Sequence, residues 1–457
     1  MFHKVKNVHF VGIGGIGMSG IAEVLLNLGF RVTGSDVRQT EITERLAGLG
    51  ARVFYGHRED NVQDAHVVVT SSAVRQENPE VQDARRRAIP VIQRAEMLAE
   101  LMRMKYSVAV AGAHGKTTTT SLVASVLQSA NLDPTCVIGG KLNSLGTNAK
   151  LGSSQYLVAE ADESDGTFLL LFPTIAVVTN IDLEHLDFYR NMEEIKAAFL
   201  AFMNKAPFFG LVILCVDDEN LASLMPSIKR RYMTYGLSEE AELRAVGLRH
   251  SGFSVAFDVL HGGRLLGEVS LAIPGVHNVV NSLAAIAVGM ELDIGFEAMA
   301  EALGQFSGIH RRLEVRWDGE IKLVDDYGHH PTEIKATLAA LRSVWKGRII
   351  VAFQPHRYSR TKALARQFAK SFNDADVLVA TEIYAASEEK IEGVTGAGLA
   401  EAVRSGGHPQ VIFAQTKEEV VARVAEIAKP GDMVVTLGAG DIYKVGEELA
   451  DLWRRKA

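Results

Sequence analysis

The sequence predicts an α/β fold of three domains, and three observations carry this prediction. The chain has 457 residues, a length that suggests three domains at roughly 150 residues each. A glycine-rich loop lies between a strand-like and a helix-like segment at residues 12–17 and again at residues 112–115. Runs of β-branched residues alternate with helix-length segments, which is typical of parallel sheets covered by helices on both faces. We expect domains at residues 1–105, 106–314 and 315–457.

Composition and charge argue against several classes of protein. Hydrophobic residues make up 47% of the chain and charged residues 23%, values that are ordinary for a globular protein. The net charge of −7 argues against a nucleic-acid-binding surface. No apolar run reaches the roughly 20 residues of a membrane span, and the N-terminus carries no apolar export segment. Cys136 and Cys215 form no metal-type cluster, so we expect a cytoplasmic protein with two reduced core cysteines.

The first domain begins with a pattern for nucleotide binding. The strand at residues 8–11 is followed by Gly-x-Gly-x-x-Gly and by a helix at residues 18–28. A second strand at residues 30–34 leads to an acidic residue about 20 positions past the last glycine, where dinucleotide-binding proteins place the carboxylate that binds ribose hydroxyls. The pattern fits NAD, and it fits any nucleoside diphosphate conjugate as well, because both contain a ribose and a pyrophosphate. The residues concerned are Gly12, Gly14, Gly15, Gly17 and Asp36.

The second domain begins with a phosphate-binding loop between a strand at residues 106–111 and a helix at residues 119–127. Glycines let backbone N–H groups approach phosphate oxygens, and the N-terminus of the helix favours an anion. The Lys116 ammonium adds a charge and the Thr117 hydroxyl can bind Mg²⁺; we expect Lys116 to point to ligand and not to the core. The loop is shorter than the standard pattern, which would need glycine where Val110 stands. The loop nevertheless predicts an ATP-binding site, formed by Gly112, Ala113, His114, Gly115, Lys116, Thr117 and Thr118.

Carboxylates and an imidazole follow the next two central strands. Residues 160–165 come after one strand and residues 179–187 after the other. Because the carboxyl ends of parallel strands lie at one edge of a sheet, these side chains should lie opposite the phosphate loop. Glu160 and Thr117 suit Mg²⁺, which prefers oxygen ligands. His185 is a less usual Mg²⁺ ligand, and positioning water or phosphate is an alternative role for it.

The rest of the chain continues the alternating pattern. An antiparallel stretch is expected near residues 252–272, and an Asp-Gly pair suggests a hinge over residues 316–320 on which the third domain closes for catalysis. The other predicted strands lie at residues 67–70, 90–92, 156–159, 175–178, 212–215, 348–353, 377–380 and 433–437.

The order of these motifs along essentially the whole chain resembles the Mur ligase family. The segments Asp-Tyr-Gly-His-His-Pro-Thr-Glu at residues 326–333 and Pro-His-Arg-Tyr-Ser-Arg-Thr at residues 355–361 resemble its alanine-adding branch or that branch's closest relative. Besides the loops described above, the resemblance extends over residues 274–281, 308–314 and 438–442.

The resemblance implies an activity and its participants. Its fold would be a Rossmann-like domain for a UDP-sugar, a central P-loop-type ATP-binding domain and a Rossmann-like C-terminal domain. The reaction would join L-alanine to the carboxylate of UDP-N-acetylmuramate through an acyl phosphate, with ATP and Mg²⁺, in the synthesis of peptidoglycan precursors. Lys116 would hold the β- and γ-phosphates, Thr117 and Glu160 one Mg²⁺, and Glu160 with His185 a second. We expect a monomer or a weak homodimer.

The same resemblance assigns further residues. Asn278 and Asn281 would contact adenine, and Arg312 and Asp326 would contact phosphate and ribose. In the first domain, His57, Ser71, Asn78 and Glu80 resemble positions on the substrate side, and of these His57 and Ser71 would bind the UDP-sugar. The amino acid would be bound by His329, Arg357 and Arg360, and the catalytic candidates are Lys116, Glu160, His185 and Arg357.

Two alternative functions stay open at this point. A sister ligase that adds a whole peptide, a tripeptide, to the same nucleotide sugar shares most of these motifs. An NAD-dependent oxidoreductase would use the first glycine loop, but it leaves Lys116, Glu160 and the arginines at 357 and 360 unexplained.

Overall fold

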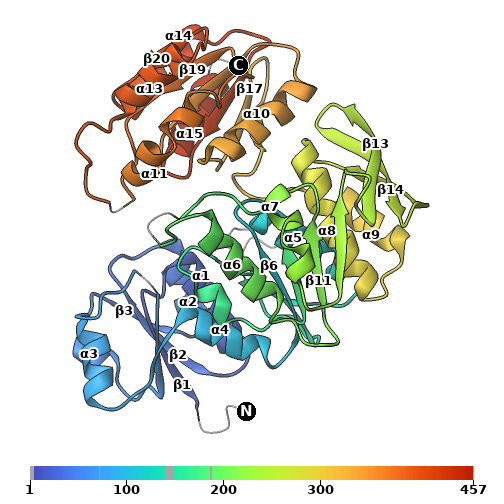
Figure 1. Ribbon diagram of the computed structural model, residues 1–457. Coiled ribbons are helices and arrows are strands. Elements are labelled where there is room, and N and C mark those ends of the chain that lie inside the picture. The colour runs from blue at the N-terminus through green and yellow to red at the C-terminus, as the bar shows by residue number, and fades with distance from the viewer. Residues whose placement is uncertain (1–4, 72, 139–148, 186–187, 387, 456–457) are drawn as a thin grey trace. The chain divides into compact units, whose positions relative to one another are not determined.

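The computed structural model describes residues 5–71, 73–138, 149–185, 188–386 and 388–455. The chain forms two compact units. The first contains Met1–Gly247, Phe257–Val269 and Val280–Phe306, and the second contains Leu248–Ala256, Ser270–Val279 and Ser307–Ala457. Strands and helices alternate along most of the chain (Figure 1), which confirms the predicted α/β class.

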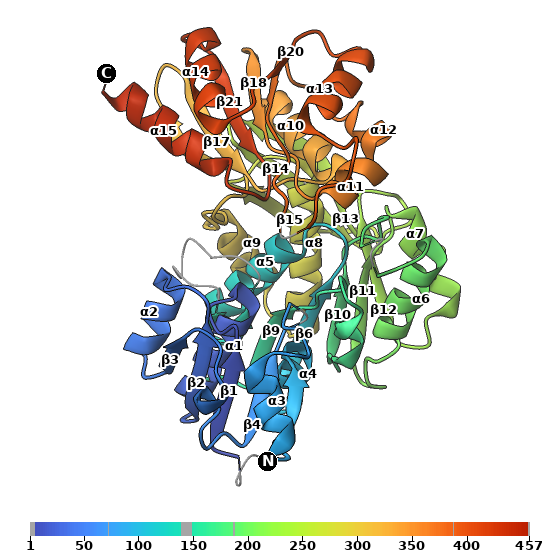
Figure 2. The same ribbon diagram turned by 90° about the vertical axis from the view of Figure 1, so that its left-hand side faces the viewer.

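The first unit holds a parallel five-stranded sheet in the order β3-β2-β1-β4-β5 (blue in Figures 1 and 2). The strand order reverses at the central strand β1, and ligands of open α/β sheets bind outside the carboxyl ends of the strands at such a point. The strands are β1 (Asn7–Val11), β2 (Arg31–Asp36), β3 (Arg52–Tyr55), β4 (Val67–Thr70) and β5 (Val91–Gln93). The helices are α1 (Ile16–Asn27), α2 (Glu41–Gly48), the 3₁₀ helix η1 (Glu59–Asn61), α3 (Pro79–Arg86) and α4 (Arg94–Met102).

A second sheet has ten strands in the order β15-β14-β13-β12-β11-β10-β6-β9-β7-β8. Its centre is parallel: β6 (Tyr106–Ala111) lies between β10 (Ile175–Val178) and β9 (Tyr156–Glu160), so the carboxyl ends of these three strands are neighbours. The other strands are β7 (Thr135–Val137), β8 (Ala149–Lys150), β11 (Leu211–Cys215), β12 (Tyr232–Gly236), β13 (Leu243–Ser251), β14 (Ser254–His261) and β15 (Arg264–Leu271). Short turns join neighbouring β13, β14 and β15, as the predicted antiparallel stretch requires.

Helices of this part of the chain connect and cover the second sheet. Helix α5 follows the loop after β6, and α8 carries the two asparagines that the sequence singled out. The helices are α5 (Lys116–Ser129), η2 (Thr167–Leu170), α6 (Met192–Met203), α7 (Glu219–Ala222), η3 (Met225–Ser227), α8 (Val276–Glu291) and α9 (Phe296–Gly304).

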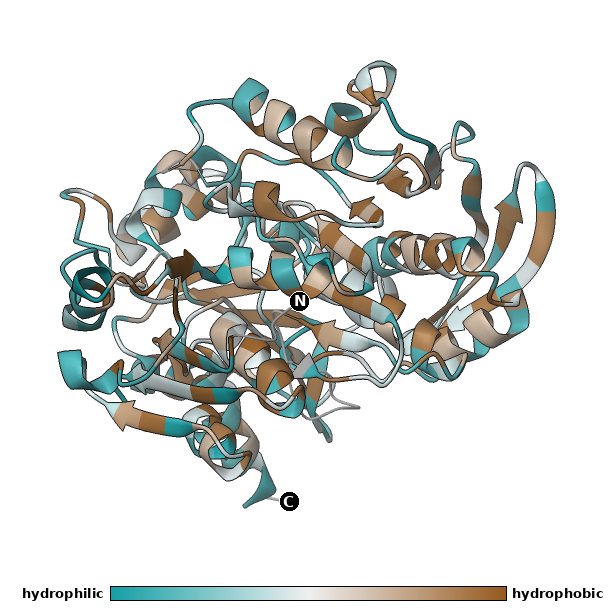
Figure 3. Cartoon of the chain, turned by 90° about the horizontal axis from the view of Figure 1, so that it is seen from below, coloured by the Kyte–Doolittle hydropathy of each residue, from teal (hydrophilic) through white to brown (hydrophobic). Residues whose placement is uncertain are grey.

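The second unit holds a six-stranded sheet in the order β16-β17-β21-β18-β19-β20, parallel except for the edge strand β16. Many strands of the molecule have the brown colour of hydrophobic residues in Figure 3. In this sheet the strands at residues 349–353, 377–380 and 433–437 are buried along their whole length, with core residues on both faces. The strands are β16 (Glu314–Asp318), β17 (Lys322–Asp326), β18 (Ile349–Phe353), β19 (Val377–Ala380), β20 (Val411–Phe413) and β21 (Met433–Leu437). The helices are α10 (Pro331–Val344), α11 (Tyr358–Ala363), α12 (Ala365–Phe368), α13 (Gly396–Ser405), α14 (Lys417–Ile427) and α15 (Tyr443–Arg454).

Alternate residues of the central strands enter two separate cores of this sheet. Val351 of β18 packs in a core with Leu338 of α10, whereas its neighbour Ile350 packs in the other core with Leu449 of α15. Successive side chains of a strand point to opposite faces. A strand buried on both faces therefore becomes a continuous apolar run, which is why these strands were predictable.

The segment at residues 316–320 is not the predicted hinge. Residues 316–318 belong to β16, which pairs antiparallel with β17 and is therefore part of the six-stranded sheet. The Asp-Gly pair at residues 318–319 opens the short turn of this hairpin, a position that Asp-Gly pairs commonly occupy.

Two smaller predictions are also tested by the fold. Cys136 and Cys215 are both buried and free, and burial raises the pKa of each thiol to about 12. Among the described residues, none of the helices combines the length and the apolar character that a membrane crossing needs.

Candidate functional site

The loop after β6 has the backbone geometry of an anion cradle. Gly112 and Gly115 have φ angles of 139° and 82°, in the region that L side chains rarely adopt. A Cβ on Gly112 would lie 2.0 Å from Thr179 Oγ1. Helix α5 starts directly after Gly115, which offers no side-chain cap, so first-turn N–H groups are available to a ligand.

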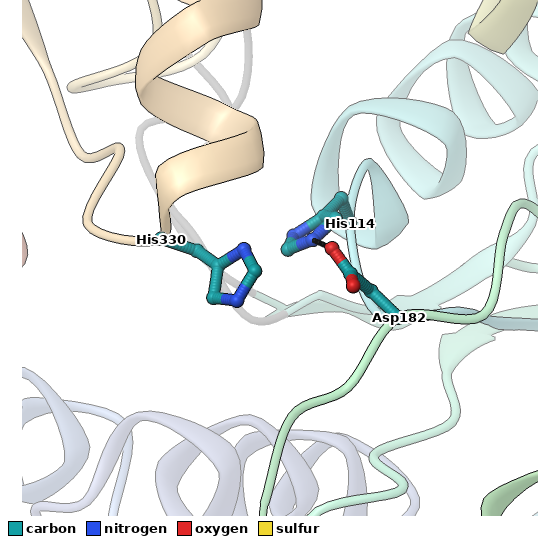
Figure 4. A group of neighbouring side chains, drawn as sticks. All are labelled: His114, Asp182 and His330. Atoms are coloured by element: carbon teal, nitrogen blue, oxygen red, sulfur yellow. Dashed lines mark hydrogen bonds and ion pairs between the residues drawn. The ribbon is translucent and has the colours of Figure 1, made fainter. Parts of the chain in front are cut away.

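Residues that follow β10 hold this loop in place. The backbone N–H of Ala113 donates to the Asn180 carbonyl at 3.1 Å, and that of His114 donates to Asn180 Oδ1 at 2.8 Å. Thr179 Oγ1 donates to the His114 carbonyl at 2.6 Å. The His114 ring points to Asp182, with Nε2 and Oδ2 2.9 Å apart (Figure 4). The loop conformation is thus set before any ligand binds.

Lys116 is folded back into the loop. Its Nζ donates to the Gly112 carbonyl at 2.5 Å and lies 2.8 Å from Glu163 Oε1. Burial by itself would lower the pKa of Lys116, but the Glu163 and Asp162 carboxylates outweigh burial and raise that pKa above its ordinary value. The side chain therefore stays cationic. Its pairing with a buried partner corrects the expectation that Lys116 would point only to ligand.

Glu163 also belongs to a cluster of possible metal ligands. Its Oε1 lies 3.5 Å from His185 Nε2, and the ligand atoms of Glu163, Glu184 and His185 all lie within 4.8 Å of one another. Glu163 is 2% exposed, and within the described residues its Oε2 is buried without a hydrogen-bond partner. Burial would lower the pKa of His185, but the neighbouring Glu163 raises it above its ordinary value. Two carboxylates in such a cluster suit a hard cation such as Mg²⁺.

Of the three residues predicted to bind Mg²⁺, Thr117, Glu160 and His185, only His185 belongs to this cluster. His185 has a φ of 55°, a conformation that costs energy outside glycine. Glu160 is the last residue of β9, opposite Val110 of β6, and Thr117 lies in the first turn of α5. Both residues lie at the carboxyl edge of the sheet, as expected, and the binding of Mg²⁺ by them stays a prediction. The sequence did not single out Glu163 as a metal ligand, because the acidic run at residues 160–165 is equally typical of a turn exposed to solvent.

The asparagines of α8 have separate surroundings. A Cβ on Gly115 would lie 2.7 Å from Asn281 Oδ1, so this amide lies against the phosphate loop. Asn278 Nδ2 donates to the Pro274 carbonyl at 2.7 Å, which ties the start of the helix to the preceding segment. The adenine contacts stay predictions for both residues.

The structure brings the first glycine loop and its acidic residue together. The Gly14 N–H donates to Asp36 Oδ2 at 2.9 Å, and the Gly12 N–H donates to the Ser35 carbonyl at 2.8 Å. A Cβ on Gly14 would lie 2.8 Å from Asp36 Oδ2, so the close approach needs glycine. Gly15 and Gly17 lie in the same turn, at the cap and in the first turn of α1.

Arg94 is a residue of this region that the sequence reasoning missed. A Cβ on Gly17 would lie 2.8 Å from its Nη1, and its Nη2 lies 3.3 Å from Asp162 Oδ2. Arg94 therefore connects the first glycine loop with the acidic segment after β9. No motif marks it, because it is an ordinary residue at a helix start.

His57 and Ser71 lie at different places on the first sheet. His57 Nδ1 is 3.0 Å from Ser35 Oγ and 3.4 Å from Glu80 Oε2. Ser71 follows β4 and lines a cavity of about 600 Å³ with Thr70, Val74, Arg85 and Gln93, among others. Its volume is in the range of small-molecule sites.

In the second unit, Asp326 organises the loops at the edge of the six-stranded sheet. Its carboxylate is buried and accepts hydrogen bonds from the backbone of Leu313 at 2.9 Å and of Gly328 at 2.8 Å. Burial raises its pKa. Arg312 lies over the Tyr327 ring at 5.2 Å. The phosphate and ribose contacts of Arg312 and Asp326 stay predictions.

The residues predicted to bind the amino acid gather around His356. Its ring is 5.5 Å from that of His329 and stacks on Tyr384 at 5.6 Å. Arg360 Nη1 is 3.3 Å from His356 Nδ1. Burial first, and then the neighbouring positive charges, lower the pKa of His356 to about 3, so the imidazole is neutral. Arg357, the residue just before α11, has a φ of 69°.

Comparison with known proteins gives the same picture over the whole chain. The model of the Mur ligase family, catalytic domain, matches residues 7–106, that of the Mur ligase middle domain residues 110–289, and that of the Mur ligase, glutamate ligase domain, residues 311–440. UDP-N-acetylmuramate–L-alanine ligase of Geotalea uraniireducens is 57% identical over 99% of both chains.

Two solved structures cover much of the chain. UDP-N-acetylmuramate–alanine ligase from Thermotoga maritima has a TM-score of 0.83 and 31% identity, covering 99% of this chain and all of its own. UDP-N-acetylmuramate:L-alanyl-γ-D-glutamyl-meso-diaminopimelate ligase from Neisseria meningitides has a TM-score of 0.62 and 29% identity, covering 67% of this chain and all of its own. The phosphate loop, its acidic partners and these matches together place the chain in a family: it belongs to the Mur ligases.

Proposed function

We propose that this chain joins L-alanine to the carboxylate of UDP-N-acetylmuramate, converting ATP to ADP and phosphate. The observation that carries the proposal is identity of 57% over 99% of the chain to a relative named for this reaction. The alternative ligase, which adds a peptide, is represented by a relative at 29% identity over 67% of the chain. Because ATP and nucleotide sugars are cytoplasmic, the reaction belongs in the cytoplasm.

Activation of the carboxylate is the task of the loop after β6. A carboxylate acylates amines poorly, so the γ-phosphoryl group of ATP is first transferred to one of its oxygens. Phosphoryl transfer depends mainly on positioning and on neutralising charge. The N–H groups at the start of α5 receive the phosphates, and Lys116, already cationic, exchanges Glu163 for phosphate oxygens.

A divalent cation fits the acidic cluster beside Lys116. Glu163 and Glu184 offer carboxylate oxygens, and the buried Oε2 of Glu163 is an acceptor that a cation would satisfy. Thr117 and Glu160 remain candidates for the same ion or a second one. When bound, Mg²⁺ would neutralise charge on the phosphates. His185 would complete the cluster through Nε2.

Amide formation needs the amine of L-alanine near the activated carbonyl carbon. Arg357 and Arg360 are suited to hold the amino-acid carboxylate, because guanidinium groups bind carboxylates in a bidentate manner. His356 stays neutral beside them, so it does not compete with the two guanidinium groups for the carboxylate. The amine attacks, and phosphate leaves with the carboxylate oxygen to which it was attached.

The five-stranded sheet is proposed to bind the nucleotide sugar. Its glycine loop is held by Asp36, and Arg94 lies between this loop and the acidic segment of the ATP-binding part. A guanidinium at this position suits either the diphosphate or the reacting carboxylate. Both loops belong to the same compact unit.

A phosphate-release assay with UDP-N-acetylmuramate and ATP tests the proposal against the alternatives. L-Alanine should give the largest kcat/KM. Glycine and serine should react more slowly but measurably, because one methyl group is worth only about 1–3 kcal/mol in a pocket. The tripeptide L-alanyl-γ-D-glutamyl-meso-diaminopimelate should give no phosphate above background. A preference for the tripeptide would assign the chain to peptide recycling. In a parallel incubation with added NAD, reduction of NAD without phosphate release would support the oxidoreductase alternative.

A further inference from the structure

The turn between α6 and β11 carries two exposed aromatic side chains at its tip. The Gly210 N–H donates to the Pro207 carbonyl at 3.0 Å, which closes a four-residue turn around Phe208 and Phe209. The two rings meet edge to face, with their centroids 5.3 Å apart. Phe208 is 90% exposed and Phe209 is 57% exposed. Turns are ordinarily built from glycine and short polar residues, so this tip exposes apolar surface that the fold does not use.

The base of this turn packs against the segment that leads into the neighbouring strand β10. A Cβ on Gly210 would lie 2.2 Å from the Thr174 carbonyl oxygen, and the Leu211 N–H donates to that oxygen at 3.1 Å. The base is therefore fixed, and the tip projects from it. Phe172, which shortly precedes Thr174, is itself 45% exposed, so both segments present an aromatic ring to solvent.

Cations lie directly beside these rings. Lys205 Nζ lies 4.6 Å from the centroid of the Phe172 ring, and the Arg103 guanidinium carbon lies 5.1 Å from the same centroid. Arg103 also pairs with Glu100. Lys205 has no carboxylate partner among the described residues, so its positive charge is not compensated by a neighbour.

Two more cations are held next to the end of α6. The Lys229 N–H donates to Asn204 Oδ1 at 2.7 Å, and Arg230 Nε donates to the Ala206 carbonyl at 2.6 Å. Both bonds fasten this basic segment to the residues that immediately precede the turn. In the part of the chain that the structure describes, neither Lys229 nor Arg230 forms an ion pair with a carboxylate. The aromatic tip is therefore flanked by positive charge.

These side chains form one surface, the amino-edge patch, at the amino ends of strands in the ten-stranded sheet. Its members are Phe172, Lys205, Phe208, Phe209, Lys229 and Arg230. Strands β10, β11 and β12 run parallel with β6, and the patch lies on the segments that lead into the first three. The phosphate loop instead follows β6, so the length of a strand, roughly 15 Å, separates it from the patch. A partner on the patch would leave the phosphate loop uncovered.

The chemistry of the amino-edge patch fits an anionic phospholipid surface. Aromatic and basic side chains together hold peripheral proteins at such surfaces, with the rings among the headgroups and the cations on lipid phosphates. A second copy of this chain, bound through the same patch, would place like charges against each other. A protein partner would need a hollow shaped to the projecting tip, whereas a fluid lipid surface adapts to it. The net charge of −7 means that anionic lipid repels the rest of the chain, which favours docking by this patch.

We propose that the amino-edge patch docks this enzyme reversibly on an anionic phospholipid surface. The rings of Phe208 and Phe209 enter the headgroup region, and Lys205, Lys229 and Arg230 bind lipid phosphates. The phosphate loop, at the other edge of the sheet, is left uncovered by the lipid. The inference concerns binding alone and does not rest on the proposed function.

Sedimentation of the full chain with large unilamellar vesicles tests this docking. Vesicles of phosphatidylglycerol and phosphatidylcholine in equal parts should carry the protein into the pellet at about 0.1 M salt and release most of it at about 0.5 M, because salt screens the attraction. Vesicles of phosphatidylcholine alone should bind about tenfold less protein, because they carry no net charge. Equal sedimentation with both kinds of vesicle, or sedimentation with neither, overturns the proposal.

Removal of the apolar tip should weaken the binding. Phe208→Ser combined with Phe209→Ser should lower the partition coefficient on anionic vesicles by about tenfold or more, because the inserted apolar surface is lost. This variant should keep the wild-type melting temperature and turnover, since both side chains are exposed. Leu265→Ser is the control, because Leu265 is 58% exposed on β15 and lies outside the patch. Unchanged binding by the double phenylalanine variant contradicts the proposal.

The cations have a control that is matched in charge. Lys205→Gln combined with Lys229→Gln should lower binding about tenfold at about 0.1 M salt, since each lysine near an anionic surface adds to the attraction. Lys370→Gln combined with Lys429→Gln removes the same charge from exposed positions of the second unit and should bind as wild type does. Equal losses in the two double variants would show attraction by the overall charge and would contradict docking by the patch.

Insertion of the tip is measured with a fluorescent label. Cys136 and Cys215 are buried, so a nitrobenzoxadiazole label added to Phe208→Cys attaches only to the new thiol. On anionic vesicles its emission should shift to shorter wavelength and be quenched by spin-labelled lipid. A label that stays in water on vesicle-bound protein contradicts insertion.

The outcomes for docking and for the proposed function are separate. Protein that binds no vesicle and yet releases phosphate with L-alanine would overturn docking on lipid, and the tip would then suit a protein partner. Protein that binds anionic vesicles through the patch but releases no phosphate with L-alanine would overturn the proposed function alone.

Discussion

Lys116 Nζ and Glu163 Oε1 form an ion pair at 2.8 Å in which the carboxylate is 2% exposed. The pair joins the phosphate loop to the acidic segment that follows β9. In the proposed function, Lys116 exchanges Glu163 for phosphate oxygens when ATP binds, and the Glu163 carboxylate would then be available to a cation.

The first prediction concerns both members of this pair. Lys116→Ala should lower kcat by about 10²–10³-fold, because it removes a positioned charge from the developing phosphoryl charge. It should also destabilise the protein by about 3–5 kcal/mol, because Glu163 is left buried without its partner. The double variant Lys116→Ala with Glu163→Gln should recover stability and not activity. Phosphate release and thermal unfolding measure the two effects, and near-normal turnover of Lys116→Ala would refute the loop assignment.

The second prediction concerns the divalent cation. Chelation should abolish phosphate release and added Mg²⁺ should restore it. Glu163→Gln and Glu184→Gln should each raise the half-saturating concentration of free Mg²⁺ by about tenfold, since each removes a charged oxygen ligand. Glu193→Gln, an exposed residue on α6, is the control. An unchanged Mg²⁺ dependence in both cluster variants would place the cation elsewhere.

The third prediction concerns the amino-acid end. Arg357→Ala should raise the KM for L-alanine by about tenfold or more, because a charge-assisted hydrogen bond is lost. The KM for UDP-N-acetylmuramate should stay unchanged. Arg357→Lys should recover little, since an ammonium lacks the planar fork. Arg366→Ala, exposed on α12, should behave as wild type. Equal increases in both KM values would show a general loss of structure instead.

The fourth prediction is a pH dependence of stability. The pKa of Glu80 is lowered from 4.5 to about 2 in the folded chain. A lowered folded pKa means that its contribution, about 3 kcal/mol, is complete above pH 4.5 and is lost as the pH falls toward 2. Hydrogen exchange of the β1 amides, corrected for intrinsic rates, should show this loss in wild type. The loss of stability should be much smaller in Glu80→Gln. Parallel plots of stability against pH for the two proteins would contradict the lowered pKa of Glu80.

Local patterns predicted most of the fold. The strands β6, β18 and β21 are continuous apolar runs, and each is buried on both faces. Both glycine loops were predictable as well, because their backbone conformations require glycine at particular positions. The hinge prediction at residues 316–320 failed because an Asp-Gly pair serves a hairpin turn as readily as a flexible connection.

The candidate site was less predictable wherever a role depends on contacts between distant residues. Glu80 meets Ser35, 45 positions earlier in the chain, and Lys116 meets Glu163, 47 positions later. The resemblance placed Glu80 on the substrate side, but no local pattern marks its contact with Ser35 or the pairing of Lys116 with Glu163, since an acidic residue in a helix start or a polar loop is ordinary. His356 and Tyr384 were missed for the same reason: their stacking is created by the sheet that brings the two loops together.

The transfer of a carboxylate oxygen tests the central claim most directly. UDP-N-acetylmuramate labelled with oxygen-18 in its carboxylate is incubated with ATP, Mg²⁺ and L-alanine, and the released phosphate and the nucleotide product are analysed by mass spectrometry. The account predicts one oxygen-18 atom in each phosphate, formed together with ADP and UDP-N-acetylmuramoyl-L-alanine. Phosphate without the label, or product formed together with AMP, would contradict activation of the carboxylate by the γ-phosphoryl group.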